Sequence, residues 1–264
     1  MLLNAVIIVL RETLEAGVLA SLLLTVGNRF QLGLRWLWFA LICGCLGALV
    51  YATNLGSVSR WFDYNGQEVV NASMQYGIYL CLLAVCLLIS SPGRVTRKIL
   101  GAFLAVTATL AFVREGTEIT VFFMGLLHDS GAQVKALTSG FIGLMIGLSV
   151  GILIYYVIMS FKPAITRQIQ MVMLVLMAAG MVEQATRLLL QADWLPATMP
   201  LWDSNGLLQE QSLSGQVAYA IFGYEATPTL VEVWFYFSAI GLILLSLFIS
   251  RRFMNPANKR DYEL

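Results

Sequence analysis

The chain has 264 residues, of which 59% are apolar and only 12% are charged, and its formal net charge is +1. Soluble domains are about 45–50% apolar and about 25% charged. With a mean hydropathy of +0.79, the composition excludes a disordered chain, a disulfide-stapled secreted domain, a nucleic-acid-binding protein and an ordinary cytosolic enzyme.

Seven stretches are long and apolar enough to cross a bilayer, which requires about 20 residues of helix. The first has charged residues in its middle, whereas a cleavable signal peptide has its charge ahead of an uninterrupted apolar run, so we expect it to be retained as a span. The sequence therefore predicts an all-α polytopic membrane protein with seven transmembrane helices. In chain order the stretches are Leu3–Val26, Leu34–Leu55, Met74–Ser90, Ile99–Leu127, Leu137–Phe161, Ile169–Leu190 and Leu230–Ile249.

Lysine and arginine are concentrated in alternate connections between these stretches. Eleven of the sixteen lie after the first, third, fifth and seventh stretches, whereas only Arg60 and Lys135 lie in the other set of connections. Basic connections remain on the cytoplasmic side of a membrane. The distribution therefore predicts an N-terminus outside and a C-terminus inside.

One charged motif occurs twice. The segment Arg11–Glu15 reads Arg-Glu-Thr-Leu-Glu, and Arg114–Glu118, 103 residues later, reads Arg-Glu-Gly-Thr-Glu. The same offset relates small residues, four apart, in the second and fifth stretches, although helix packing alone would explain those. They are Ala40, Gly44 and Ala48, and Gly143, Gly147 and Gly151.

The repeat implies an inverted architecture. Three spans are an odd number, so two copies of the unit cross the membrane in opposite directions, as in many transporters whose site lies near the midplane. We therefore predict one transmembrane permease domain with two inverted three-helix repeats plus one C-terminal helix. Its parts are repeat one (about 1–91), repeat two (about 99–190), an outside loop (191–229), the seventh helix (230–250) and a cytoplasmic tail (251–264).

Each copy of the motif places one arginine and two glutamates near mid-membrane, on one face of a helix. A charged residue there costs on the order of 3 kcal/mol, so we expect the six groups to neutralise one another and to face a polar interior. Two Arg–Glu ion pairs that only hold helices together would explain one glutamate per arginine, but not the second glutamate of each motif. The remaining charge of −2 indicates a cation site with four carboxylate ligands and two charge-balancing arginines. The ligands are Glu12, Glu15, Glu115 and Glu118, and the arginines are Arg11 and Arg114.

The ligand type restricts the cation. Carboxylate oxygens suit hard cations, whereas soft metals prefer sulfur. Fe³⁺ fits such a site, Mn²⁺ and Fe²⁺ fit it less selectively, and protons could be carried or exchanged. The sequence has no nucleophile–base pair, no glycine-rich phosphate loop and no cofactor motif, so neither an enzyme nor a resident cofactor is predicted.

Other acidic residues are weaker candidates. Glu183 and Arg187, four apart in the sixth stretch, are expected to form a local pair and could have an accessory role. Glu232, at the start of the last stretch, is either another accessory residue or simply solvated. Four acidic residues of the outside loop could concentrate cations at an entrance, although loop solubility explains them equally well. They are Asp193, Asp203, Glu210 and Glu225.

The two Arg-Glu-x-x-Glu motifs, in the first and fourth of seven spans, resemble those of the oxidase-dependent iron transporter family of high-affinity iron permeases, which includes a fungal ferric permease and bacterial EfeU-type permeases. The segment Ile221–Thr229, which reads Ile-Phe-Gly-Tyr-Glu-Ala-Thr-Pro-Thr, is similar to a run that precedes the family's last helix. The resemblance covers essentially the whole chain. Thr13 departs from it, because the family often has glycine at that place.

The resemblance implies iron uptake across the cytoplasmic (inner) membrane, with iron as the transported substrate and the motif glutamates as its ligands. It also implies a separate extracytoplasmic oxidase or iron-binding protein that delivers the metal. Some relatives are linked to other metals such as lead. The alternatives are therefore a proton-coupled transporter of another divalent metal, such as Mn²⁺ or Pb²⁺, and a non-transporting membrane scaffold for an iron-binding partner.

Overall fold

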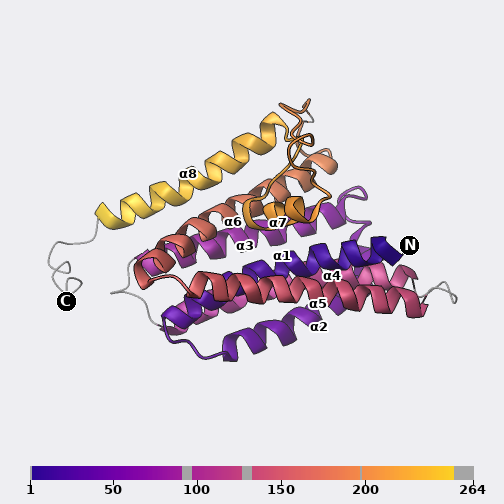
Figure 1. Ribbon diagram of the computed structural model, residues 1–264. Helices are drawn as coiled ribbons and strands as arrows, with labels where there is room; N and C mark the ends of the chain where they lie inside the picture. Colours follow the sequence, from indigo (N-terminus) through magenta and orange to yellow (C-terminus); the bar gives the residue numbers. More distant parts are fainter. Residues whose placement is uncertain (1, 91–96, 127–132, 197, 253–264) are drawn as a thin grey trace.

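The computed structural model describes residues 2–90, 97–126, 133–196 and 198–252 (Figure 1). Within these residues the regular structure consists of eight α-helices, with no strand apart from an isolated antiparallel bridge between Pro200 and Thr229. The predicted all-α class is confirmed. The helices are α1 (Leu2–Arg29), α2 (Arg35–Val58), α3 (Gly66–Ser90), α4 (Arg97–Leu126), α5 (Gln133–Met159), α6 (Pro163–Gln191), α7 (Leu213–Phe222) and α8 (Leu230–Arg252).

Six of the described helices are long and apolar enough to cross a membrane, namely α2, α3, α4, α5, α6 and α8. Each contains most of one predicted stretch, and the chain is a multi-pass membrane protein. The 28 residues of α1 give a helix of about 42 Å at roughly 1.5 Å per residue, but three charged residues interrupt its apolar sequence. The seventh span therefore stays a prediction, and most of the predicted tail, from residue 253 onward, lies outside the described residues.

The predicted outside loop contains a helix that the sequence analysis does not predict. With ten residues, α7 is too short to span a bilayer. It begins where the Ser212 hydroxyl accepts a hydrogen bond from the Gly215 amide, and it ends at Gly223, whose φ is 66°. A Cβ atom on Gly223 would lie 2.5 Å from the Gly180 Cα of α6, so only glycine permits this approach. This contact fixes the end of α7 against α6.

The long helices pair in a regular way. Helix α1 packs along α5, α2 along α4 and α3 along α6, while α1 also contacts α4. Small residues permit the closest approaches, because a Cβ on Gly147 would lie 2.8 Å from the Thr13 Cβ, and one on Gly44 would lie 2.4 Å from the Phe112 Cβ. Figure 1 shows α8 at the edge of the bundle, where it contacts α6 and α3.

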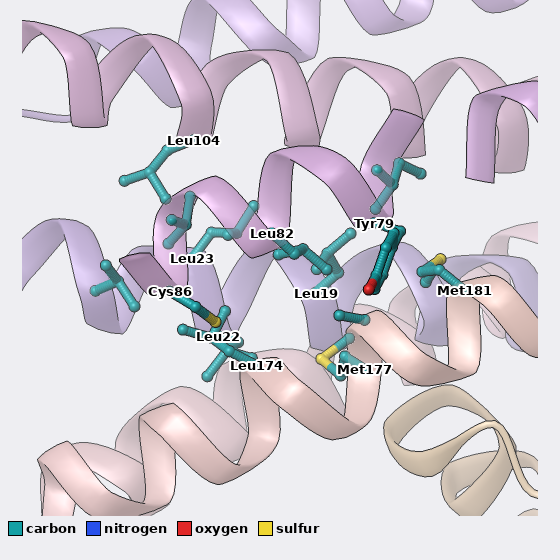
Figure 2. Close-up of a cluster of buried hydrophobic side chains, with 14 of the residues drawn as sticks. Leu19, Leu22, Leu23, Tyr79, Leu82, Cys86, Leu104, Leu174, Met177 and Met181 are labelled. Carbon is teal, nitrogen blue, oxygen red and sulfur yellow. The ribbon is translucent and has the colours of Figure 1, made fainter. Parts of the chain in front are cut away.

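In α1 and α4 an apolar core lies between the charged motif and the helix end that carries Arg29 or Arg97. Figure 2 shows part of this core. In a bilayer, such a core holds helices together by close van der Waals packing rather than by removal of apolar surface from water. Its fully buried side chains include Leu19, Leu22, Leu82, Leu104, Leu174 and Met177.

Candidate cation site

Three of the four motif glutamates meet between α1 and α4. Glu12 comes from α1, and Glu115 and Glu118, about one turn apart, come from α4. One carboxylate oxygen of each lies within 4.8 Å of the other two. Glu12 and Glu115 are buried, whereas the Glu118 side chain is 38% exposed. These three residues, called the triad below, direct oxygen atoms from two helices toward a common point.

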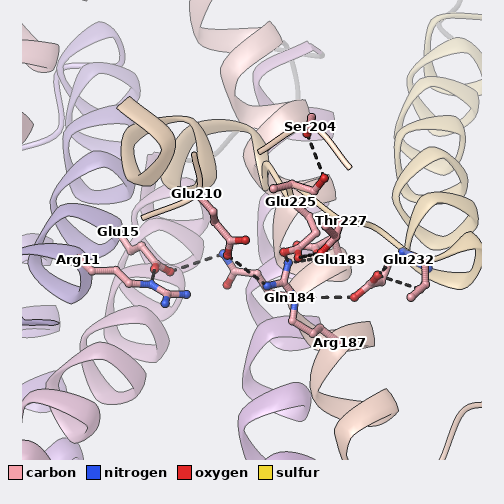
Figure 3. Close-up of polar contacts among 12 residues, drawn as sticks. Arg11, Glu15, Glu183, Gln184, Arg187, Ser204, Glu210, Glu225, Thr227 and Glu232 are labelled. Atoms are coloured by element: carbon pink, nitrogen blue, oxygen red, sulfur yellow. Dashed lines mark hydrogen bonds and ion pairs between the residues drawn. The ribbon is translucent and has the colours of Figure 1, made fainter. Parts of the chain in front are cut away.

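Glu15 lies beside the triad and is held by other groups. Its carboxylate accepts hydrogen bonds from Arg11 Nε at 3.3 Å, Arg114 Nη1 at 3.3 Å and Gln184 Nε2 at 3.5 Å. Gln184 in turn accepts a hydrogen bond from Gln75 Nε2 at 2.7 Å. Figure 3 shows Glu15 next to Arg11, with Gln184 approaching from α6. Glu15 thus connects four helices and does not belong to the group of three converging oxygens.

The two motif arginines make different contacts. Arg114 is buried and forms ion pairs with Glu15, with the adjacent Glu115 and, at 3.6 Å, with Glu118. Arg11 forms an ion pair with Glu15, and 42% of its side chain is exposed, compared with 8% for Arg114. Most of the compensating charge therefore comes from Arg114.

The cluster carries more negative charge than its arginines balance, because four glutamates and two arginines leave −2. One oxygen of Glu12 and one of Glu115 are buried without a hydrogen-bond partner in the part of the chain that the structure describes. Such groups are costly in an apolar environment unless another charge satisfies them. Carboxylate oxygens are the ligands that hard cations accept, so the donor set fits a hard metal cation.

One cavity reaches the triad at Glu12. It has a volume of about 440 Å³ and is also lined by Arg11, Glu210 and Tyr219. Because its other lining residues include Ile7 and Ile8, it extends toward the beginning of α1. The cavity therefore connects Glu12 with the residues at that end of the bundle.

A second cavity reaches the triad at Glu118. It has a volume of about 340 Å³, and its lining includes Glu68 and Asn71 of α3. One oxygen of Glu68 is buried and has no hydrogen-bond partner among the described residues. The sequence analysis does not select Glu68, because α3 begins at Gly66 rather than at the predicted Met74. If the sequence analysis had extended the third helix to Gly66, Glu68 would have been recognised as a further acidic residue within a helix.

A second group of carboxylates surrounds Arg187 (Figure 3). Arg187 Nη2 donates a hydrogen bond to Glu183 Oε1 at 2.7 Å, which confirms the predicted local pair. Arg187 also forms a close ion pair with Glu225 and contacts Glu210 and Glu232, each at 3.7 Å. The structure thus gathers acidic residues of α6, α8 and the 191–229 segment around the Arg187 guanidinium.

The structure does not gather all of the predicted accessory and entrance residues. Glu232 is buried, and its carboxylate accepts hydrogen bonds from the amide and hydroxyl of Thr229, so the alternative of a simply solvated Glu232 is wrong. This residue caps the beginning of α8. Asp193 and Asp203 are exposed and form no ion pair with Arg187 among the described residues, and Asp203 accepts hydrogen bonds from Asn205 instead.

Comparisons with known proteins identify a family and several relatives. Residues 100–255 match the iron permease FTR1 family, which is more than half of the chain. The chain is 24% identical over 270 residues to the ferrous iron permease EfeU of Yersinia pestis, with 93% of each chain covered. It is also 24% identical over 269 residues to the protein of that name from Escherichia coli O157:H7, covering 91% of this chain and 94% of the relative. No solved structure matches the chain.

These matches confirm the family resemblance that the two motifs indicate. The family and the names of the relatives describe a permease, so the chain is a transporter and not an enzyme. The chain belongs to the iron permease FTR1 family.

Proposed function

We propose that this chain carries iron into the cytoplasm through the triad, with Glu15 as a fourth carboxylate beside it. Membership of the FTR1 family supports iron as the substrate. The observation that carries the proposal is the convergence of three carboxylate oxygens within 4.8 Å, with unpaired oxygens on two buried side chains. Arg11 and Arg114 lower the charge of the site without cancelling it, which favours binding that still permits release.

The proposed form of the ion is Fe³⁺, because carboxylates are hard ligands. Fe²⁺ is the second candidate, since the relatives from Yersinia pestis and Escherichia coli are named ferrous iron permeases. The proposed location is the cytoplasmic (inner) membrane, with a separate extracytoplasmic oxidase or iron-binding protein as the donor of the metal.

We further propose that α1 is the seventh span and that α1–α3 and α4–α6 are inverted repeats, with the N-terminus outside. In this arrangement α1 is equivalent to α4, α2 to α5 and α3 to α6. The α1–α5 contact then corresponds to the α4–α2 contact, and the α3–α6 contact corresponds to itself. A two-fold relation between repeats produces this pattern. The orientation is supported by Arg29 and Arg97, which lie at helix ends near each other, since Arg97 Nη2 donates to Gln31 Oε1 at 3.5 Å.

In the proposed route, a cation enters from the outside through the cavities at Glu12 and Glu118. The acids around Arg187 serve as accessory groups near the entrance, because Glu210 both contacts Arg187 and lines the Glu12 cavity. Asp193 and Asp203 contribute only to the general negative charge of that surface.

Uptake of radiolabelled iron by cells that produce single variants tests the proposal. Glu12→Gln and Glu115→Gln should each lower uptake severely while surface labelling shows normal amounts in the membrane, because each removes a negative ligand from the triad. Asp203→Asn is the matched control, since it removes an exposed acid outside both clusters, and should leave uptake unchanged. Normal uptake by Glu115→Gln would refute the proposal. Supplying iron as ferric citrate or as ascorbate-reduced iron with a ferrous chelator distinguishes the two oxidation states.

A further inference from the structure

The two motifs have the same charged residues, yet their arginines occupy different positions. Arg114 contacts Glu115, the next residue in the chain, which shows that an arginine at this place in the motif can reach its neighbour. By the same spacing Arg11 could reach Glu12. Arg11 instead pairs with Glu15, and among the described residues it forms no ion pair with Glu12.

An aromatic ring from α7 accounts for this difference. The Arg11 guanidinium lies over the ring of Tyr219, 4.7 Å from its centroid. Cation–π contacts act within about 6 Å of the ring centroid and favour this arrangement. No aromatic ring in the described chain contacts Arg114 in this way, and Arg114 pairs with Glu115 and Glu118 of its own motif as well as with Glu15. The contact from α7 therefore breaks the equivalence of the two motifs.

Tyr219 is held firmly enough to act on Arg11. Its side chain is buried, with 6% of the residue exposed, and Arg187 of α6 lies on the same ring at 5.7 Å. The glycine contact between α7 and α6 fixes the helix that carries it. Burial, followed by the charges of Glu15 and Glu183, raises the pKa of Tyr219, so the ring remains a neutral phenol.

We propose that Tyr219 is a positioning residue that holds Arg11 on Glu15 and thereby keeps the Glu12 carboxylate available to the transported cation. This inference rests on the proposed function. Without the ring, Arg11 is free to take the position on Glu12 that Arg114 takes on Glu115. Both buried carboxylates of the triad would then be paired with arginine, and the site would bind a cation more weakly.

The concentration dependence of iron uptake tests this role. Tyr219→Leu should raise the KM for iron by about tenfold, between the scales of an exposed and a desolvated cation–π contact because Arg11 is partly exposed, with a smaller change in the maximal rate. Tyr219→Phe retains the ring but loses the hydroxyl, which also contacts Arg11, so it should raise the KM by less than Tyr219→Leu does. Tyr224→Phe is a control in the same segment, because its hydroxyl contacts Ser204 and the Leu208 carbonyl rather than Arg11.

A double substitution separates positioning from a purely structural role. In an Arg11→Gln background the change Tyr219→Leu should have no further effect on the KM, because the group that it releases is gone. Additive effects of the two substitutions would overturn the inference, as would a normal KM for Tyr219→Leu. If Tyr219→Leu does not reach the membrane, Tyr219→Met, which also lacks a ring, is measured with the same criteria.

The same assay distinguishes failure of this inference from failure of the proposed function. Loss of uptake in Glu115→Gln together with an unchanged KM in Tyr219→Leu would overturn the role of Tyr219 alone. Normal uptake in Glu115→Gln would overturn both.

Discussion

Replacing Glu12 or Glu15 with glutamine removes one buried negative charge in either case, but the two substitutions should have opposite effects on stability. Glu15 accepts hydrogen bonds from three groups, including both motif arginines. Glu12 has a buried oxygen without a hydrogen-bond partner in the described chain and lies near two other carboxylates. Attraction therefore holds Glu15 in place, whereas repulsion acts on Glu12 in the metal-free protein.

The distances between the charged groups give the size of the change in stability expected for each substitution. The carboxylate oxygens of the triad lie at most 4.8 Å apart, and at that separation and an effective dielectric constant of about 20 two unit charges interact by about 3.5 kcal/mol. The unpaired amide of the new glutamine offsets part of this relief of repulsion, so Glu12→Gln should raise the free energy of unfolding by about 1–3 kcal/mol. Removing Glu15 leaves buried Arg114 with one partner fewer and should lower it by about 3 kcal/mol.

Thermal unfolding of the purified protein in detergent, with a chelator present and followed by circular dichroism, measures both changes. For a chain of this size, 1 kcal/mol corresponds to about 2–4 °C in Tm. We expect Tm to rise for Glu12→Gln and to fall for Glu15→Gln, with Asp203→Asn unchanged. A fall in Tm for Glu12→Gln that equals the fall for Glu15→Gln would refute the account of the triad as a repulsive group.

Four further predictions follow from the described contacts. If the triad binds a single ion, the losses of uptake caused by Glu12→Gln and Glu115→Gln should be strongly non-additive in the double variant, whereas additive losses would indicate separate sites along a path. Mn²⁺ or Fe²⁺ at about 100 times its dissociation constant should stabilise the original protein by about 2.7 kcal/mol in the thermal assay, but should not stabilise Glu115→Gln. Equal shifts in Tm for the two proteins would contradict binding at the triad. Gly147→Ala should lower the free energy of unfolding by about 1–3 kcal/mol, because its Cβ would lie 2.8 Å from the Thr13 Cβ. Gly101→Ala, with no heavy atom within 4 Å of its Cβ, should not lower it. Equal stability of the two variants would contradict the close α1–α5 packing. In a background without the native cysteines, Asn205→Cys should react with an impermeant reagent added outside the cell and Gln31→Cys should not, and the opposite pattern would reverse the proposed orientation.

Features that depend on spacing within one helix could be predicted from the sequence. The apolar stretches, the grouping of charges on one face of α1 and of α4, and the pair formed by Glu183 and Arg187 are of this kind, because each follows from helical periodicity. The same argument places Glu15 and Glu118 in equivalent positions of the two motifs.

Contacts between distant parts of the chain decide the remainder, and a single sequence does not reveal them. Gln184 reaches Glu15 from α6, while a cavity lined by α3 opens beside Glu118, so equivalent glutamates have different surroundings. Tyr219 contacts Arg11 only because α7 folds back onto α6. Glu232 is buried because it caps its own helix and faces Arg187, a residue 45 positions earlier in the chain.

The apolar core beyond the triad has a consequence for the membrane as an electrical barrier. Leu19, Leu22 and Leu174 present only hydrocarbon to an ion that moves from the triad toward the ends of the helices at Arg29 and Arg97. An ion without water or charged ligands is many kcal/mol less stable in such surroundings than in solution. In the described conformation this layer is a barrier to protons and metal ions, and in the proposed route the leucine side chains of α1 and α6 would have to separate for iron to pass.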